Sequence, residues 1–129
     1  MKDGKTVILH IEDDQDYIDS MRLIIEKAGH LFVAAKSAEK GIQMFREHQP
    51  DFIIVDMMME EVDSGVNIIK DLKLAGNTAP VFMLSSVGDQ LHATTSYTEL
   101  GLSGVFQKPI VPEIIVRTIA DKLENSGNE

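Results

Sequence analysis

Short apolar runs alternate with segments of helical period along this chain. The runs have the length and β-branched content of buried strands, whereas the segments between them repeat apolar residues at three- and four-residue spacing. Such alternation is typical of βα units that build one parallel sheet with helices on both faces. The five expected strands are 7–11, 31–35, the run that ends at residue 56, 81–84 and 104–107.

Each of these strands is expected to be followed by a helix, and residues typical of helix ends mark several of the boundaries. Asp14 and Ser37 are good N-caps for the first two helices, and Pro112 suits the first turn of the last one. The third helix is expected from about Val66. The stretch 88–100 has a thin apolar stripe and several poor helix formers, so it predicts only a short fourth helix.

Connection rules narrow the topology of such a sheet. Right-handed crossovers and two layers of apolar-striped helices favour a flavodoxin-like, doubly wound five-stranded parallel sheet of order 2-1-3-4-5. A chain of 129 residues fits one such α/β domain. We expect residues 1–129 to form a single domain, with an ordered core at about 5–124 and a polar, frayed tail at 125–129.

Composition removes several classes of function. The chain has no cysteine, which excludes disulfides and thiolate metal sites. Its net charge of −9 disfavours direct binding to nucleic acid or to an anionic membrane. No segment resembles a signal peptide or a membrane span. These features predict a cytoplasmic protein that works through protein partners.

Reactive polar residues stand at the ends of four of the five strands. Glu12 and Asp13 follow the first strand, Asp56 ends the third, Ser85 follows the fourth, and Lys108 follows the fifth. The carboxyl ends of parallel strands lie along one edge of the sheet, where such folds bind their ligands. The sequence therefore predicts that these side chains converge on one site.

The chemistry of this set favours a metal ion and a phosphoryl group. Asp13 and Asp56 would repel each other unless a cation lies between them. Mg²⁺ suits a few carboxylate oxygens and keeps open positions for a phosphoryl oxygen, while Lys108 and Ser85 can bind other oxygens of that group. No general base and no glycine-rich phosphate loop is evident. The natural nucleophile is therefore a carboxylate.

Taken in order, these residues resemble the receiver domains of bacterial two-component response regulators, of the single-domain kind found in chemotaxis. That family has an acidic pair after strand one, a phosphoacceptor aspartate at the end of strand three, Ser or Thr after strand four and Lys-Pro after strand five. The matching residues are Glu12-Asp13, Asp56, Ser85 and Lys108-Pro109. The resemblance covers nearly the whole chain.

The resemblance implies a phosphoacceptor rather than an enzyme that turns over a substrate. Asp56 would take a phosphoryl group from a histidine kinase or a histidine phosphotransfer protein. Mg²⁺ would be held by Asp13, Asp56 and the backbone carbonyl of Met58, with Glu12 acting mostly through water. A cis bond is expected between Lys108 and the proline after it.

The same resemblance implies how the signal leaves the domain. Lys108 and Ser85 would bind the phosphoryl group, and the face made by helix four, strand five and helix five would change shape. A downstream effector protein or domain would bind that face. Two departures from the family pattern affect this output: Glu60 and Ser64 replace the usual proline and glycine of the loop after Asp56, and Val105 stands at the usual aromatic switch position, beside Phe106.

Other functions fit the residues less well. A receiver-like module that binds partners without being phosphorylated is the main alternative. A hydrolase of the haloacid dehalogenase type would need a second aspartate where this chain has Met58. A flavin carrier would meet repulsion between the acids after the first strand and the FMN phosphate.

The four histidines lack the paired spacing of metal ligands. Each is expected to be a surface residue or a strand residue with a hydrogen-bond partner; they are His10, His30, His48 and His92. Asp14 is expected to cap a helix rather than bind metal.

Overall fold

The computed structural model describes residues 4–56, 64–85 and 102–127. Its strands form one sheet in the order β2-β1-β3-β4-β5, as predicted. All four strand pairings are parallel, so the carboxyl ends of the strands share one edge of the sheet. The strands are β1 (Val7–Ile11), β2 (Leu31–Ala35), β3 (Phe52–Asp56), β4 (Val81–Ser85) and β5 (Gly104–Gln107).

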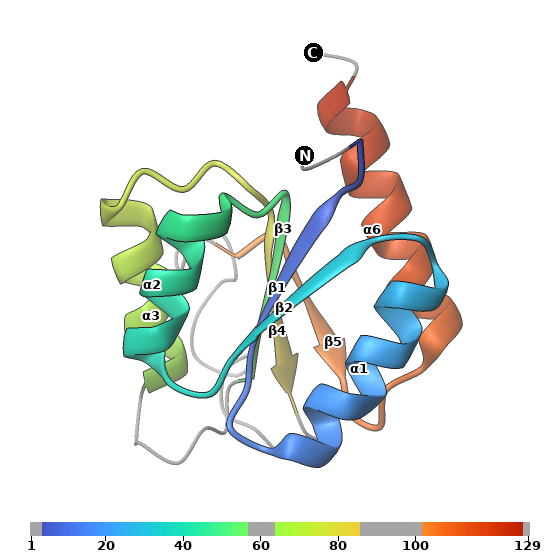
Figure 1. The fold of residues 1–129 in the computed structure, drawn as a ribbon, viewed down its shortest axis with the longest axis horizontal. Coiled ribbons are helices and arrows are strands. Elements are labelled where there is room, and N and C mark those ends of the chain that lie inside the picture. The colour runs from blue at the N-terminus through green and yellow to red at the C-terminus, as the bar shows by residue number, and fades with distance from the viewer. Residues whose placement is uncertain (1–3, 57–63, 86–101, 128–129) are drawn as a thin grey trace.

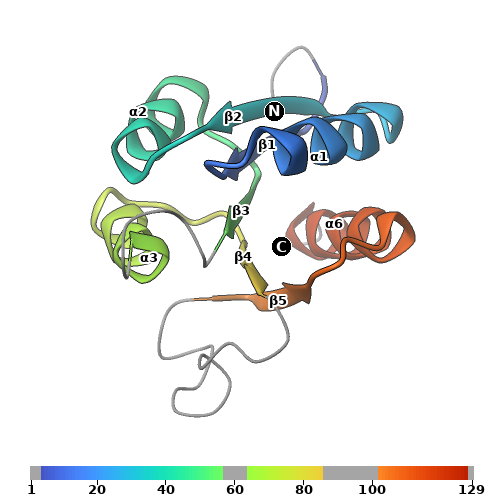
Figure 2. The same cartoon turned by 90° about the horizontal axis from the view of Figure 1, so that it is seen from below.

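Helices cover both faces of this sheet (Figure 1). The helices in the described part of the chain are α1 (Gln15–Lys27), α2 (Ala38–His48), α3 (Ser64–Leu74) and α6 (Pro112–Gly127). Figure 2 shows α2 and α3 on one side of the sheet and α1 and α6 on the other. Within the described ranges, no helix combines the length and apolar character that a membrane crossing needs.

Two predicted boundaries are wrong. Helix α3 begins at Ser64 rather than near Val66. Helix α6 continues to Gly127, so the predicted frayed tail from residue 125 begins too early. The predicted fourth helix, at 88–100, lies outside the described residues.

Helix caps fix the chain close to the carboxyl edge of the sheet. The Asp14 side chain accepts a hydrogen bond of 2.9 Å from the backbone N–H of Asp16, and Ser37 accepts one of 3.1 Å from that of Lys40. Both predicted N-caps are thereby confirmed. Because α1 starts at Gln15, the acidic pair is held in a short turn between β1 and the helix.

The core has two halves, one on each face of the sheet. The half under α1 and α6 contains a row of three phenylalanines from neighbouring strands. The ring of Phe82 stacks on Phe52 at 5.1 Å and on Phe106 at 4.8 Å between centroids. Gly104 lies beside this row, and a Cβ atom on it would be 2.5 Å from Cε2 of Phe82. The absence of a side chain at Gly104 therefore leaves room for the central ring.

Substitution Gly104→Ala should destabilise the fold by about 1–3 kcal/mol, because the stacked ring beside it is not free to retreat. The measurement is the free energy of unfolding from urea titration. The exposed neighbour Ser103 provides a control, since Ser103→Ala should change stability by less than about 0.5 kcal/mol. Equal stabilities of the two variants would contradict this account of the packing.

Candidate functional site

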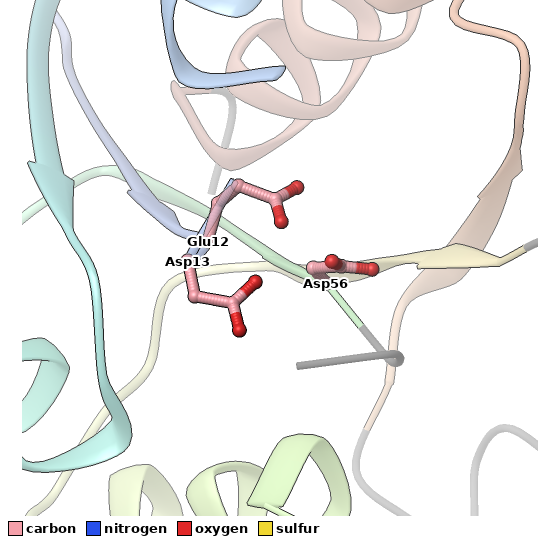
Figure 3. Close-up of side chains that lie close together, drawn as sticks. All are labelled: Glu12, Asp13 and Asp56. Atoms are coloured by element: carbon pink, nitrogen blue, oxygen red, sulfur yellow. The ribbon is translucent and has the colours of Figure 1, made fainter. Parts of the chain in front are cut away.

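Three predicted acids meet at the carboxyl edge of the sheet. Figure 3 shows Glu12 and Asp13 in the turn after β1, with Asp56 beside them at the end of β3. Each offers a carboxylate oxygen, and these oxygens lie within 4.8 Å of one another. Glu12 and Asp56 are buried and Asp13 is half-buried. The site thus concentrates negative charge where water screens it poorly.

Lys108 supplies a positive charge to this cluster. Its Nζ donates a 3.0 Å hydrogen bond to Oδ1 of Asp56. Burial by itself would lower the pKa of Lys108, but the hydrogen bond and charge of Asp56, together with the charges of Glu12 and Tyr17, outweigh it and raise the pKa. Lys108 is therefore a fixed ammonium group at neutral pH.

Tyr17 also contacts this ammonium group. Its ring, in the first turn of α1, has its centroid 4.4 Å from Nζ of Lys108, which is a cation–π distance. Lys108 thus lies between an aromatic face and a carboxylate. The sequence pattern indicates only that Tyr17 is on the apolar stripe of its helix. It does not predict the contact between the ring and the ammonium group of Lys108.

Ser85 and Lys108 are held at the ends of neighbouring strands. Ser85 ends β4 and is buried, and its backbone carbonyl accepts a 2.8 Å hydrogen bond from the backbone N–H of Lys108. The Lys108–Pro109 peptide bond is cis, as expected. Met58 and Glu60 lie outside the described residues.

Burial controls the protonation of Glu12. Its pKa is raised from 4.5 to about 9, first by burial and then by a hydrogen bond and charge from Asp56. The backbone N–H of Asp14, 3.4 Å from Oε2 of Glu12, and the charge of Lys108 act in the opposite direction. Without a further cation, Glu12 therefore holds a proton at neutral pH. Such a carboxyl group is suited to a divalent cation, which displaces that proton on binding.

His10 lies beneath the acidic cluster, in the middle of the sheet. It pairs with Ala34 of β2 and Ile54 of β3, and none of its surface is exposed. Burial lowers its pKa from 6.5 to about 3; the charge of Asp56 opposes this shift and that of Lys108 adds to it. Neither ring nitrogen has a hydrogen-bond partner among the described residues. The prediction of a surface or hydrogen-bonded residue is wrong for His10.

Strand alternation separates the two residues at the expected switch position. Val105 packs against the core half under α2 and α3. Phe106 is buried in the opposite half, stacked on Phe82. Phe106 therefore does not occupy the place that an aromatic residue at position 105 would take.

Comparisons with known proteins agree with this geometry. The family model of the response regulator receiver domain matches residues 8–120. The chain is 27% identical over 124 residues to the transcriptional regulatory protein CseB of Streptomyces avermitilis, which covers 96% of this chain and 52% of that protein. It is 26% identical over 109 residues to the probable transcriptional regulator ycf27 of Guillardia theta, covering 84% and 42%. The chain spans about half the length of these curated relatives.

Solved structures share the fold. A receiver domain protein from Clostridium thermocellum superposes with a TM-score of 0.84 at 22% identity, covering 95% of this chain and 97% of the other. A CheY-like receiver domain protein from Methanospirillum hungatei gives 0.86 at 18% identity, covering 97% and 98%. With the family match over most of its length, the chain belongs to the response regulator receiver domains, a family of signalling domains.

Proposed function

We propose that Asp56 accepts a phosphoryl group from a phosphohistidine on a histidine kinase or a histidine phosphotransfer protein. The observation that carries this proposal is the contact between Nζ of Lys108 and Oδ1 of Asp56, at 3.0 Å, beside two further carboxylates. A carboxylate that already binds one ammonium group at a strand end is placed to act as a nucleophile. The family match supports the same role.

The domain needs to supply little covalent chemistry for this transfer. An oxygen of Asp56 forms the new P–O bond while the P–N bond to the donor histidine breaks, and the released imidazole takes up a proton from solvent. The domain contributes position and positive charge, which dominate phosphoryl transfer. Lys108 can follow the negative charge from the carboxylate to the phosphoryl oxygens, and the Ser85 hydroxyl would bind another of these oxygens.

The acidic cluster fits a magnesium ion. Glu12, Asp13 and Asp56 would hold it, together with the carbonyl of Met58. Burial and the neighbouring Asp56 raise the pKa of Glu12, and a cation at this place would oppose that shift. When bound, the ion would neutralise charge on the phosphoryl oxygens. The acids of this chain then serve to orient the carboxylate of Asp56 and to keep the site selective for a hard cation.

The signal would pass to a downstream effector protein or domain. Two relatives bear names of transcriptional regulators and are about twice as long as this chain, which is consistent with an effector region beside the receiver. The proposed readout begins at Ser85 and Lys108, which are joined through the backbone at the ends of β4 and β5. A shift at either residue therefore reaches the other strand directly.

Phosphorylation is tested with acetyl phosphate and Mg²⁺, followed by intact mass. The wild type should gain the mass of one phosphoryl group, and Asp56→Asn should gain none. Asp14→Asn is a matched control, because it removes a nearby carboxylate while keeping a good helix cap. This control should be modified like the wild type. An unmodified wild type would disprove the proposal and favour a module that only binds partners.

Metal-free stability should fall as pH rises from about 7.5 to 9. The folded state keeps a proton on Glu12 up to about pH 9, whereas the unfolded chain releases it above about 4.5. The folded state thus binds more protons in this window, and stability decreases by at most about 1.4 kcal/mol per pH unit. Burial lowers the pKa of His10 and His30 in the folded state, so both add the opposite trend near pH 6.5, but above about pH 7.5 they are almost entirely neutral in both states.

The measurement is urea unfolding in the presence of a chelator, with Glu12→Gln as the comparison. The variant cannot titrate at this position, so its stability should stay nearly level across the window. Saturating Mg²⁺ should flatten the wild-type profile, because the bound ion favours ionised Glu12. Parallel profiles for the wild type and the variant would show that Glu12 is not the titrating group.

A further inference from the structure

His10 is a buried polar residue that the proposed chemistry does not use. Side chains two residues apart in an extended chain point to the same face, so His10 in β1 and Glu12, just after this strand, are neighbours. Nε2 of His10 lies 3.7 Å from Oε1 of Glu12, and both side chains are 0% exposed. Among the described residues, neither ring nitrogen of His10 nor this oxygen of Glu12 has a hydrogen-bond partner.

The surroundings of His10 are otherwise apolar. The edge of its ring meets Phe32 at 5.9 Å between centroids, and its partners across the sheet are Ala34 and Ile54. Burying an imidazole without a hydrogen bond costs stability, and an aliphatic side chain would fill this place at no such cost. Packing alone therefore does not account for a histidine here.

Glu12 offers the acceptor that His10 lacks. The separation of 3.7 Å is beyond a hydrogen bond, but a shift of roughly 0.5–1 Å brings it into range. In the present arrangement Glu12 also interacts with Asp56, one of the other acids of the cluster. Carboxylates that bind metals are commonly oriented by a hydrogen bond from a residue that does not itself contact the metal.

We propose that His10 is a positioning residue for Glu12: its Nε2–H donates to Oε1 and thereby fixes which oxygen of Glu12 faces the cation site. This inference rests on the proposed magnesium site. It assigns a specific tautomer to His10, with the proton on Nε2 and none on Nδ1. It also explains why the sheet retains a polar residue directly beneath the acidic cluster.

Two substitutions separate positioning from packing. His10→Leu fills the space without a donor, and His10→Gln places an amide N–H near the position of Nε2–H. His10→Leu should be at least as stable as the wild type when metal-free, yet bind Mg²⁺ about 10-fold more weakly by titration calorimetry at pH 8. His10→Gln should recover most of that affinity. Equal Mg²⁺ affinity of His10→Leu and the wild type would overturn the proposal.

A spectroscopic measurement on the wild type keeps the test independent of the variants' folding. The ¹⁵N shifts of the His10 ring, recorded with and without Mg²⁺, report which nitrogen carries the proton. A protonated Nε2 whose signal changes on adding Mg²⁺ supports the inference, and a proton on Nδ1 overturns it. If the wild type binds Mg²⁺ and is phosphorylated while His10 fails either test, the proposed function stands and only the positioning role is lost.

Discussion

Repulsion among three carboxyl groups is the constraint on which this site depends. Oxygens of Glu12, Asp13 and Asp56 lie within 4.8 Å of one another, and two of these residues are buried. The protein meets the repulsion in two ways, with the ammonium group of Lys108 on Asp56 and with a proton held by Glu12. Both are replaceable, since a cation can displace the proton and a phosphoryl group can draw the lysine away. The same balance that stabilises the resting site would therefore prepare it for the proposed cation and phosphoryl group.

Much of this arrangement could be predicted because parallel strands leave little freedom at their ends. Once the apolar runs are taken as strands of one parallel sheet, the residues after β1 and at the end of β3 must share an edge. The caps at Asp14 and Ser37 were equally predictable, because each depends on one side chain and a nearby N–H. The first residue of α3 and the last residue of α6 were harder to predict, because helix boundaries are uncertain by one or two residues. At the end of α6, polar residues such as Asn125 suit a last helical turn nearly as well as a tail.

The sequence does not reveal the contacts of two residues of the site, His10 and Tyr17. The apolar run around His10 shows that this residue is in a strand. A central strand of a parallel sheet is buried on both faces, so the sequence does not indicate which residue His10 contacts. Helical spacing directs Tyr17 inward, yet its ring meets Lys108, a residue that only the complete sheet brings near. Strand and helix patterns predict which residues are buried, whereas their contacts depend on how the elements pack together.

The phenylalanine row limits how strand β5 can transmit a signal. For Phe106 to turn outward it would have to leave Phe82 and expose an aromatic side chain, at a cost of about 2–4.5 kcal/mol. The phosphoryl group proposed for Asp56 would shift a conformational equilibrium only by its difference in interaction with the two states. Val105, on the opposite face and only partly buried, can move at far lower cost. A change that reaches the surface through β5 would therefore involve the backbone and side chains such as Val105 rather than Phe106, which is packed in the core.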